Sequence, residues 1–279
     1  TFAHGVPSLL GVAHKRALTL IREDARSTET LCRVREFDAI IPLAAVVGAA
    51  ACDLDPVDAI SLNRIAVEDI VEKAREDQVI LFPCTNSGYG LGGETECTED
   101  SPLTPLSLYG TTKVEAERAV LVHPLGVSFR LATLFGTSPR MRLDLLVNDL
   151  CLRAVRDHAL VLFEPHFRRN FLHVRDAAAA FLWALERPEA LARRPWNLGD
   201  SRANMSKEDL AGLIACEVGN VAVETAAVDA DPDKRDYIVS NARIEALGWH
   251  PLHTIREGIR ELVQAYRAMP FEDRRWRNA

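Results

Sequence analysis

Residues 79–90 read VILFPCTNSGYG, and this stretch decides the fold class. Four consecutive apolar residues, Val79 to Phe82, are typical of a strand that is buried on both faces, as in a parallel sheet. The small polar residues from Thr85 onward follow this strand directly. Polar groups that leave the carboxyl end of a central strand enter the crevice where open α/β sheets bind ligands. We therefore predict a parallel sheet with a binding crevice at Thr85.

The sequence on both sides repeats the same order of strand and helix. Upstream, residues 38–43 form another short apolar run, and Asp55-Pro56 is an N-cap followed by proline at the first helical position. This helix is predicted to run to about Arg75. Downstream, residues 106–122 have a helical pattern and residues 127–131 form the next apolar strand. The alternation predicts an α/β fold, with a parallel sheet and helices on both of its faces.

The pattern becomes less regular after Gly136. We expect a helix over 142–156, strands over 159–163 and 171–174, and a helix that begins at Asp176. Capping-box spacings predict two further helices, which are Ser206-x-x-Asp209 to about Val218 and Thr254-x-x-Glu257 to about Ala268. We predict a first domain over residues 1–135 and a smaller C-terminal α/β lobe over 136–279, from which segments such as 171–190 return to the first domain.

Composition narrows the class of protein. The chain has 279 residues, of which 48% are hydrophobic and 26% are charged, and its formal net charge is −7. Excess negative charge argues against nucleic acid as a partner, and no apolar run approaches the ~20 residues of a membrane helix. Six scattered cysteines without metal-ligand spacing predict reduced thiols, no metal site and a cytoplasmic location. No signal peptide is recognisable at the start, although the first residue is Thr rather than Met.

Tyr109 and Lys113 are the candidate catalytic pair. Their i, i+4 spacing in a predicted helix places phenol and ammonium on one face. Tyrosine ionises near pH ~10, and a neighbouring cation favours the phenolate, so Lys113 would tune Tyr109 for proton transfer. Taken alone, the same spacing also describes an ordinary helix with an exposed Lys and a half-buried Tyr. Likewise, Thr85 to Gly90 alone would describe a simple turn.

Together, these elements resemble the extended short-chain dehydrogenase/reductase family, in particular its NAD-dependent nucleotide-sugar epimerase/dehydratase group. The resemblance covers essentially the whole chain. Its matching segments are Asp24 in Arg22–Arg26, Leu43-Ala44-Ala45, Asn63, Thr85–Gly90, Tyr109 with Lys113, Arg169–Asp176, and Leu247–Pro251. The family resemblance implies a Rossmann-like first domain that binds a dinucleotide, and a smaller lobe that binds the substrate.

The resemblance also implies roles for individual residues. The catalytic residues are Tyr109, Lys113 and Thr85. The cofactor NAD, with NADP not excluded, is expected to contact Asp24, Leu43, Ala44, Ala45, Asn63, Tyr109 and Lys113. A nucleoside-diphosphate sugar is expected at Thr85, Asn86, Ser87, Thr133 and Arg169. Apart from the resemblance, Arg235 belongs to a basic pair suited to a pyrophosphate and is a further substrate candidate, and His173 is expected to be a buried supporting residue. Apolar stripes on the helices near 56–75 and 106–122 are similar to the family's dimer helices, so we predict a homodimer.

Three departures from the family pattern refine the expectation. No G-x-x-G-x-x-G fingerprint is present, which leaves two explanations: about forty N-terminal residues are missing, as judged from the size of a βαβ unit, or the protein no longer binds dinucleotide. Asn86 and Ser87 occupy the places where the family's dehydratases carry Asp and Glu, and neither can act as a carboxylic acid. Thr133 stands where many members carry Asn.

We therefore predict an NAD(P)-dependent epimerase that acts on a nucleoside-diphosphate sugar through a transient keto intermediate. Two alternatives remain open. One is a nucleotide-sugar reductase or dehydrogenase with net cofactor turnover, and the other is a non-catalytic sugar-nucleotide or dinucleotide sensor.

Overall fold

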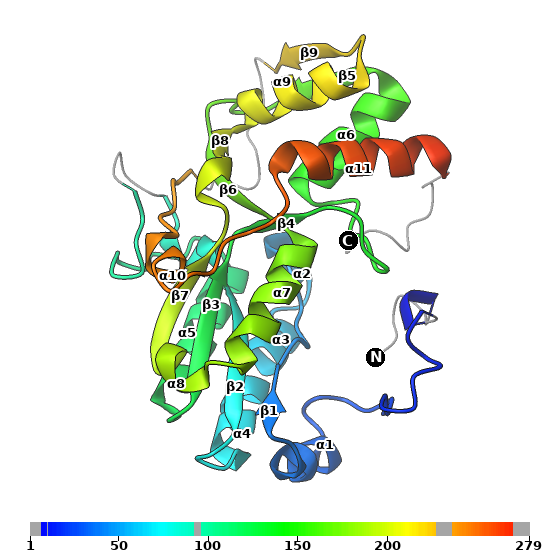
Figure 1. The fold of residues 1–279 in the computed structure, drawn as a ribbon. Helices are drawn as coiled ribbons and strands as arrows, with labels where there is room; N and C mark the ends of the chain where they lie inside the picture. Colours follow the sequence, from blue (N-terminus) through cyan, green and yellow to red (C-terminus); the bar gives the residue numbers. More distant parts are fainter. Residues whose placement is uncertain (1–6, 10, 92–95, 227–235, 270–279) are drawn as a thin grey trace.

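The computed structural model describes residues 7–9, 11–91, 96–226 and 236–269, and its centre is a four-stranded parallel sheet (Figure 1). The strands lie in the order β1, β2, β3 and β7, with bounds Ala39–Ile40, Val79–Thr85, Gly126–Leu131 and Arg194–Leu198. Thr85 pairs with Leu131 and Leu131 pairs with Leu198, so β2, β3 and β7 end together. The predicted α/β fold with a parallel sheet is confirmed.

Helices cover both faces of this sheet. Successive side chains of β2 point to opposite faces, and the apolar side chains on each face pack against helices. Ile80 and Phe82 pack on one face with residues of α4 (Ala66–Lys73) and α5 (Leu108–Val122). Val79 and Leu81 pack on the other face, in a core that includes α7 (Val174–Leu185) and the end of α8 (Pro188–Leu191). A strand that is buried on both faces is apolar without interruption, which explains the run Val79–Phe82.

Two upstream elements differ in detail from the prediction. The strand expected over 38–43 is reduced to Ala39–Ile40, since Pro42 has no N–H to donate to a ladder and Leu43 N instead donates to Ile41 O. The helix begins as predicted, with Asp55 accepting from Asp58 N at 3.0 Å. It is α3 (Pro56–Ile60), continued through a π-helical turn (Ser61–Ile65) into α4.

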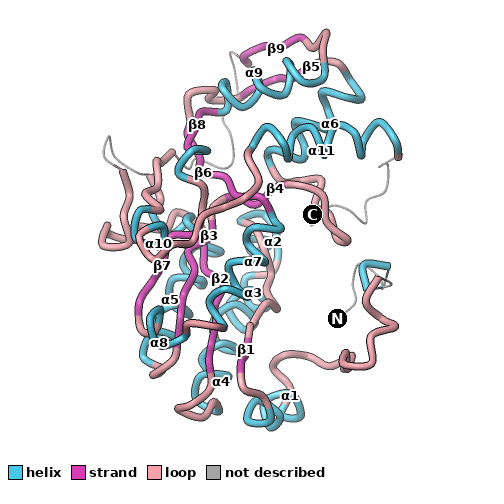
Figure 2. Tube along the Cα trace, in the orientation of Figure 1, coloured by secondary structure: helices cyan, strands magenta, loops and turns pink. Residues whose placement is uncertain are grey.

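The second half of the chain builds a separate apolar core. The helices α6 (Leu146–Asp157), α9 (Lys207–Val218) and α11 (Ile255–Ala268) surround it, and both predicted capping boxes are present. A parallel pair, β5 (Ala159–Leu162) with β9 (Ala222–Thr225), lies at its outer end (Figure 2). The strands β4 (Thr133–Phe135), β6 (Arg168–His173) and β8 (Asn204–Ser206) connect it to the main sheet region.

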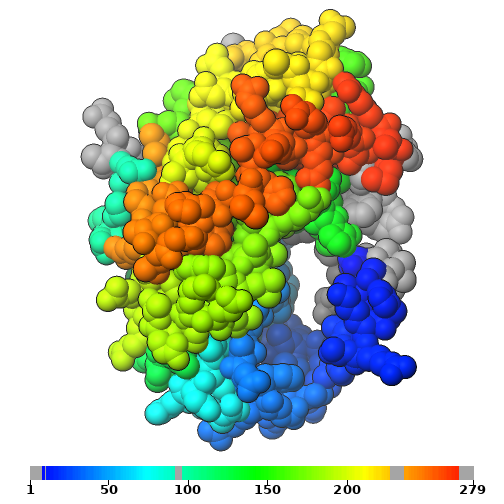
Figure 3. Space-filling view, viewed as in Figure 1, coloured from blue at the N-terminus to red at the C-terminus, as the bar shows by residue number. Residues whose placement is uncertain are grey.

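The remaining described elements are short. The helices are α1 (Thr28–Arg33), α2 (Ala49–Leu54) and α10 (Ala242–Glu245), and 3-10 turns cover Pro7–Leu9, Val34–Glu36, Asn86–Tyr89 and Ser201–Ala203. Residues 11–24 are exposed, and Figure 3 shows this dark blue stretch standing across an open gap from the rest of the molecule. Within the described ranges, no helix has both the length and the apolar character needed to cross a membrane.

Candidate functional site

The site begins where β2 ends. Thr85 caps the 3-10 turn Asn86–Tyr89, and its Oγ1 accepts from Ser87 N at 3.1 Å and donates to Ser87 Oγ at 2.9 Å. The turn packs against the start of α5, since a Cβ on Gly110 would lie 3.3 Å from Ser87 O. Thr85 therefore lies in a turn that packs against the first turn of α5, which carries Tyr109.

Asn86 stands out within this turn. Its side chain is buried, with the residue 1% exposed, and neither Oδ1 nor Nδ2 has a hydrogen-bond partner among the described residues. Buried polar groups in proteins are nearly always paired. The amide is thus a donor and an acceptor held out of water at the end of β2.

Tyr109 and Lys113 both lie on α5. Ser107 caps this helix, with its Oγ accepting from Gly110 N at 3.2 Å. Tyr109 lies in the first turn and is half-buried. Lys113 is 3% exposed, and its Nζ lies 4.0 Å from the centroid of the Phe82 ring. Burial lowers the pKa of Lys113 to about 8. The structure therefore places a buried cation one turn after the tyrosine, on the side of the helix that faces β2.

A second buried cation, Arg130 on β3, pairs with Glu117, which lies one turn after Lys113 on α5. The Arg130 guanidinium donates to both Glu117 carboxylate oxygens, and Ser128 Oγ donates to the same carboxylate at 2.7 Å. Burial alone would lower the pKa of Arg130, but the bonds to Glu117 outweigh it and hold that pKa above its usual range. Arg130 also donates to Tyr89 Oη at 3.0 Å, and Tyr89 donates to Asn197 Oδ1 at 2.6 Å. This network ties the turn, α5, β3 and β7 together.

The predicted cofactor residues at the end of β1 are close to each other. Leu43 is 69% exposed, Ala44 is exposed and Ala45 is half-buried. Asn63 is buried, and its Oδ1 accepts from Val46 N at 2.8 Å while its Nδ2 donates to Val46 O at 2.9 Å. Asn63 thus fixes the loop that follows Ala45 through its backbone.

Asp24 lies upstream of these residues in the sequence, and its carboxylate pairs with the nearby Arg26. Its carboxylate accepts from Arg26 Nε at 2.9 Å and from Arg26 Nη2 at 2.7 Å. Arg26 also bonds Asp58 on α3. These bonds to Arg26 hold the pKa of Asp24 well below its usual range. Asp24 is therefore linked through Arg26 to Asp58 on α3.

The predicted substrate residues lie on the strands that lead to the second core. Thr133 is half-buried on β4 and pairs with Phe171 of β6. Arg169, also on β6, is 2% exposed, with its guanidinium carbon 5.9 Å from the Tyr237 ring centroid and one nitrogen donating to Arg168 O at 3.0 Å. Arg235 lies outside the described residues.

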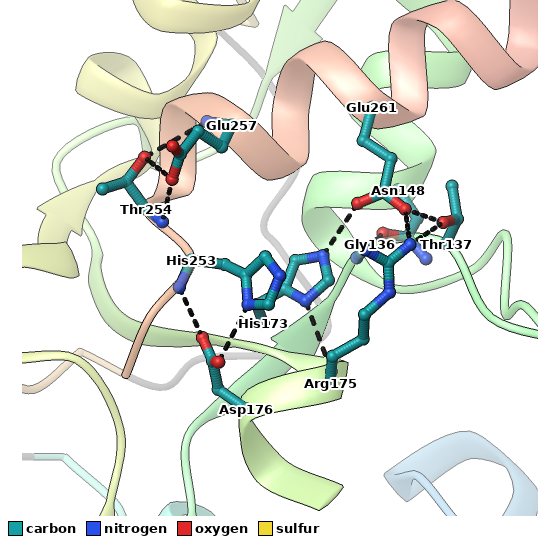
Figure 4. A network of polar contacts seen from close by, with 10 residues as sticks. All are labelled: Gly136, Thr137, Asn148, His173, Arg175, Asp176, His253, Thr254, Glu257 and Glu261. Atoms are coloured by element: carbon teal, nitrogen blue, oxygen red, sulfur yellow. Dashed lines mark hydrogen bonds and ion pairs between the residues drawn. The ribbon is translucent and has the colours of Figure 1, made fainter. Parts of the chain in front are cut away.

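Figure 4 shows a network that the sequence did not predict. His173 accepts from Arg175 N at Nδ1, so its Nε2 carries the proton that is donated to Glu261 at 3.0 Å. Glu261, on α11, also bonds Thr137 and Arg175. His253 stacks on His173 at a ring separation of 4.5 Å. The expectation that His173 is a buried supporting residue agrees with its 1% exposure and with this pairing.

The second histidine of this network is fastened to α7. His253 Nδ1 lies 2.8 Å from Asp176 Oδ1, and His253 N donates to the other carboxylate oxygen at 2.9 Å. Two glycines allow the segments to come this close, because a Cβ on Gly136 would overlap His173 and a Cβ on Gly258 would overlap Phe135. The sequence signal was the acid and histidine content near the predicted start of α11, but only the fold brings these residues to the end of β6.

Comparisons with a family model and with individual relatives both point to the same family of enzymes. The model of the NAD dependent epimerase/dehydratase family matches residues 7–199. The chain is 25% identical over 225 residues to an uncharacterised UDP-glucose epimerase, YtcB, of Bacillus subtilis, covering 76% of this chain and 70% of the relative. It is 28% identical over 271 residues to UDP-glucuronic acid decarboxylase 3 of Arabidopsis thaliana, covering 92% and 76%.

Solved structures show the same fold. The UDP-glucuronic acid 4-epimerase of Bacillus cereus, in complex with UDP-glucuronic acid and NAD, superposes with a TM-score of 0.82 at 19% identity, covering 95% of this chain and 86% of that one. The dTDP-glucose 4,6-dehydratase of Bacillus anthracis, in complex with NAD, gives a TM-score of 0.81 at 20% identity, covering 99% and 87%.

Proposed function

Because the chain belongs to the NAD dependent epimerase/dehydratase family, we propose that it is an NAD(P)-dependent epimerase of a nucleoside-diphosphate sugar. Its relatives carry names of enzymes that act on UDP-sugars, and a fold relative was solved with both NAD and a UDP-sugar. These names support the class of nucleotide-sugar substrate. The choice of epimerisation rests on the residues at the end of β2.

One observation carries the proposed chemistry, namely that Lys113 is buried without a carboxylate partner among the described contacts and lies one turn from Tyr109. A cation close to a phenol favours the phenolate. Tyr109 takes the proton of a sugar hydroxyl as the carbon that bears it is oxidised, and returns the proton when the keto group is reduced. Thr85, fixed beside the same helix turn, holds that hydroxyl.

The residues present fit part of a dinucleotide. Leu43 and Ala44 expose apolar surface at the carboxyl end of β1, and the buried Lys113 offers an ammonium group for ribose hydroxyls. Leu43, Ala44, Ala45, Tyr109 and Lys113 would hold the nicotinamide and ribose, whereas the sequence contains no G-x-x-G-x-x-G turn for the pyrophosphate. When bound, NAD accepts and returns the hydride.

Asn86 and Ser87 favour epimerisation over dehydration. Elimination of water from a sugar calls for an acid and a base, and neither an amide nor a hydroxyl serves as one near neutral pH. A reductase on a similar substrate is the second candidate. It differs from an epimerase in consuming a reduced cofactor in proportion to product.

The test is conversion of a UDP-hexose to its epimer without added NADH, followed by chromatography of the nucleotide sugars. Tyr109→Phe keeps the aromatic ring but removes the proton-transfer group, so turnover should fall by at least ~10²-fold. The variant should unfold at the same temperature as the wild type. Near-normal turnover in the Phe variant would show that Tyr109 does not carry the chemistry.

We also propose a homodimer formed through α3, α4 and α5. Leu54 and Val57 are 80% and 79% exposed near the start of this helical layer, and Val122 is 74% exposed at the end of α5. Exposed large apolar side chains on this helical layer favour association. Light scattering at micromolar concentration should give twice the chain mass, and a monomer mass would refute this assembly.

We further propose that the domain division lies near residues 135 and 136. The separate apolar core of the second half supports it, because this core draws on residues from Phe135 onward. Limited proteolysis should then release fragments cut close to this division, and cuts confined to other loops would count against it.

A further inference from the structure

We propose that the Asn86 amide reads a neutral, hydroxyl-bearing edge of the sugar and selects against a uronate carboxylate. This inference rests on the proposed function and adds the class of sugar to it. The starting observation is that Asn86 is 1% exposed and that both polar atoms of its side chain lack partners within the described part of the chain.

An unpaired buried amide is costly to fold around, because both its donor and its acceptor lose their bonds to water. Asn86 lies in the turn between Thr85, the proposed ligand of the reacting hydroxyl, and the start of the helix that carries Tyr109. A bound sugar at this place gives the amide the partners that the described residues do not provide.

The chemistry of an amide limits what those partners are. Nδ2 only donates and Oδ1 only accepts, so the pair is matched by hydroxyl groups, which do both. A carboxylate only accepts, so it would satisfy Nδ2 and would place a negative oxygen against Oδ1. Asn86 therefore favours the hydroxymethyl form of a hexose over the corresponding uronic acid.

The charges behind the turn support the same choice. Arg130, which contacts the turn at Tyr89, is paired with Glu117. Glu99 is buried, with its side chain 3% exposed, and lies 3.4 Å from Arg243. Arg130 and Arg243 already have carboxylate partners, and the Lys113 ammonium lies against the Phe82 ring, so neither arginine supplies a free positive charge for an additional buried carboxylate.

The test compares two ligands and two variants. Calorimetric titration of UDP-glucose and UDP-glucuronate into the wild-type chain should show tighter binding of UDP-glucose by about tenfold or more, which corresponds to about 1.4 kcal/mol. Asn86→Leu fills a similar volume without polar atoms, and it should bring the ratio of the two affinities close to one.

The control is Asn197→Leu. Asn197 is also fully buried, but its Oδ1 accepts from Tyr89 Oη at 2.6 Å and its Nδ2 donates to Ser240 O at 3.0 Å. Without ligand, Asn86→Leu should raise the unfolding temperature by about 2–4 °C because it removes unpaired groups, whereas Asn197→Leu should lower it.

The possible results distinguish a failure of the proposed function from a failure of the inference about Asn86. Binding of neither sugar nucleotide would overturn the proposed function, and the choice of sugar with it. Binding of both with a ratio near one, or a ratio that Asn86→Leu leaves unchanged, would overturn the inference alone. A lower unfolding temperature for Asn86→Leu, similar to that of Asn197→Leu, would show that the amide has a structural role and would also overturn the inference.

Discussion

Two buried cations lie at α5: Lys113 belongs to the helix itself, and Arg130 reaches from β3 to Glu117, one turn farther along the helix. Arg130 meets the carboxylate of Glu117, and its pKa stands above the usual range. Lys113, four residues before Glu117, meets the ring of Phe82, and burial lowers its pKa to about 8. Arg130 is paired with a carboxylate, whereas Lys113 has no carboxylate partner among the residues that the structure describes. The turn of α5 around Glu117 therefore stabilises the fold, whereas the turn around Lys113 holds a charge that is available for the proposed reaction.

The largest effect should come from breaking the paired cation. Glu117→Ala leaves Arg130 buried without its counter-charge, which should lower the free energy of unfolding by about 3–5 kcal/mol in urea denaturation. Glu115→Ala is the matched control on the same helix, because Glu115 pairs with Arg64 at 2.9 Å while both side chains are about a third exposed. That variant should cost less than ~1 kcal/mol. Equal losses would mean that the Arg130 pair is no more structural than a surface pair.

An effect of opposite sign is expected at the unpaired cation. Lys113→Met should stabilise the chain by ~2 kcal/mol at pH 7, because the native pKa of about 8 lies below the ordinary value of 10.5 and folding then opposes protonation. The cost of the lysine is fully present below pH 8 and is lost as the pH rises to 10.5. The difference between variant and wild type in urea unfolding should therefore shrink over that window. A constant difference from pH 7 to 10.5 would contradict the unpaired state of Lys113.

The smallest effect concerns the hydroxyl that joins the paired network to the turn. Tyr89→Phe removes the bond to Asn197 and the bond from Arg130, so the free energy of unfolding should fall by about 1–2 kcal/mol. Thermal unfolding of the variant and of the wild type, compared under the same conditions, measures this loss of stability. No change at all would mean that the turn is held by its packing, and that the network does not extend to it.

The fold was predictable where local signals agree with the tertiary structure. The apolar run Val79–Phe82 predicts a strand, and the capping boxes at Ser206 and Thr254 predict helix starts from residues three apart. The structure has the strand and both helices at these places. The strand expected to reach Leu43 ended early, because one proline removed the ladder donor. Local patterns locate elements well, but they fix the ends less well.

The candidate site was predictable only in part. Tyr109 and Lys113 share one helix, so their spacing suffices to pair them, and Thr85 follows from the end of a strand. The links of Glu117 to Arg130 and of His173 to Glu261 join residues from different elements. No local period encodes such contacts, because they depend on how the sheet and α11 pack. The roles assigned by resemblance to Asp24, Thr133 and Arg169 stay predictions.

The two hydrogen bonds between Asn63 and the backbone of Val46 have a consequence for kinetics. The amide acts as a substitute peptide group, so the loop beside Leu43 has the bonds of a paired strand residue without a neighbouring strand. A loop that is already ordered pays little entropy when a ligand settles on it. We therefore expect the association rate constant of a ligand at this loop to be limited by diffusion and orientation, because no loop-ordering step precedes binding.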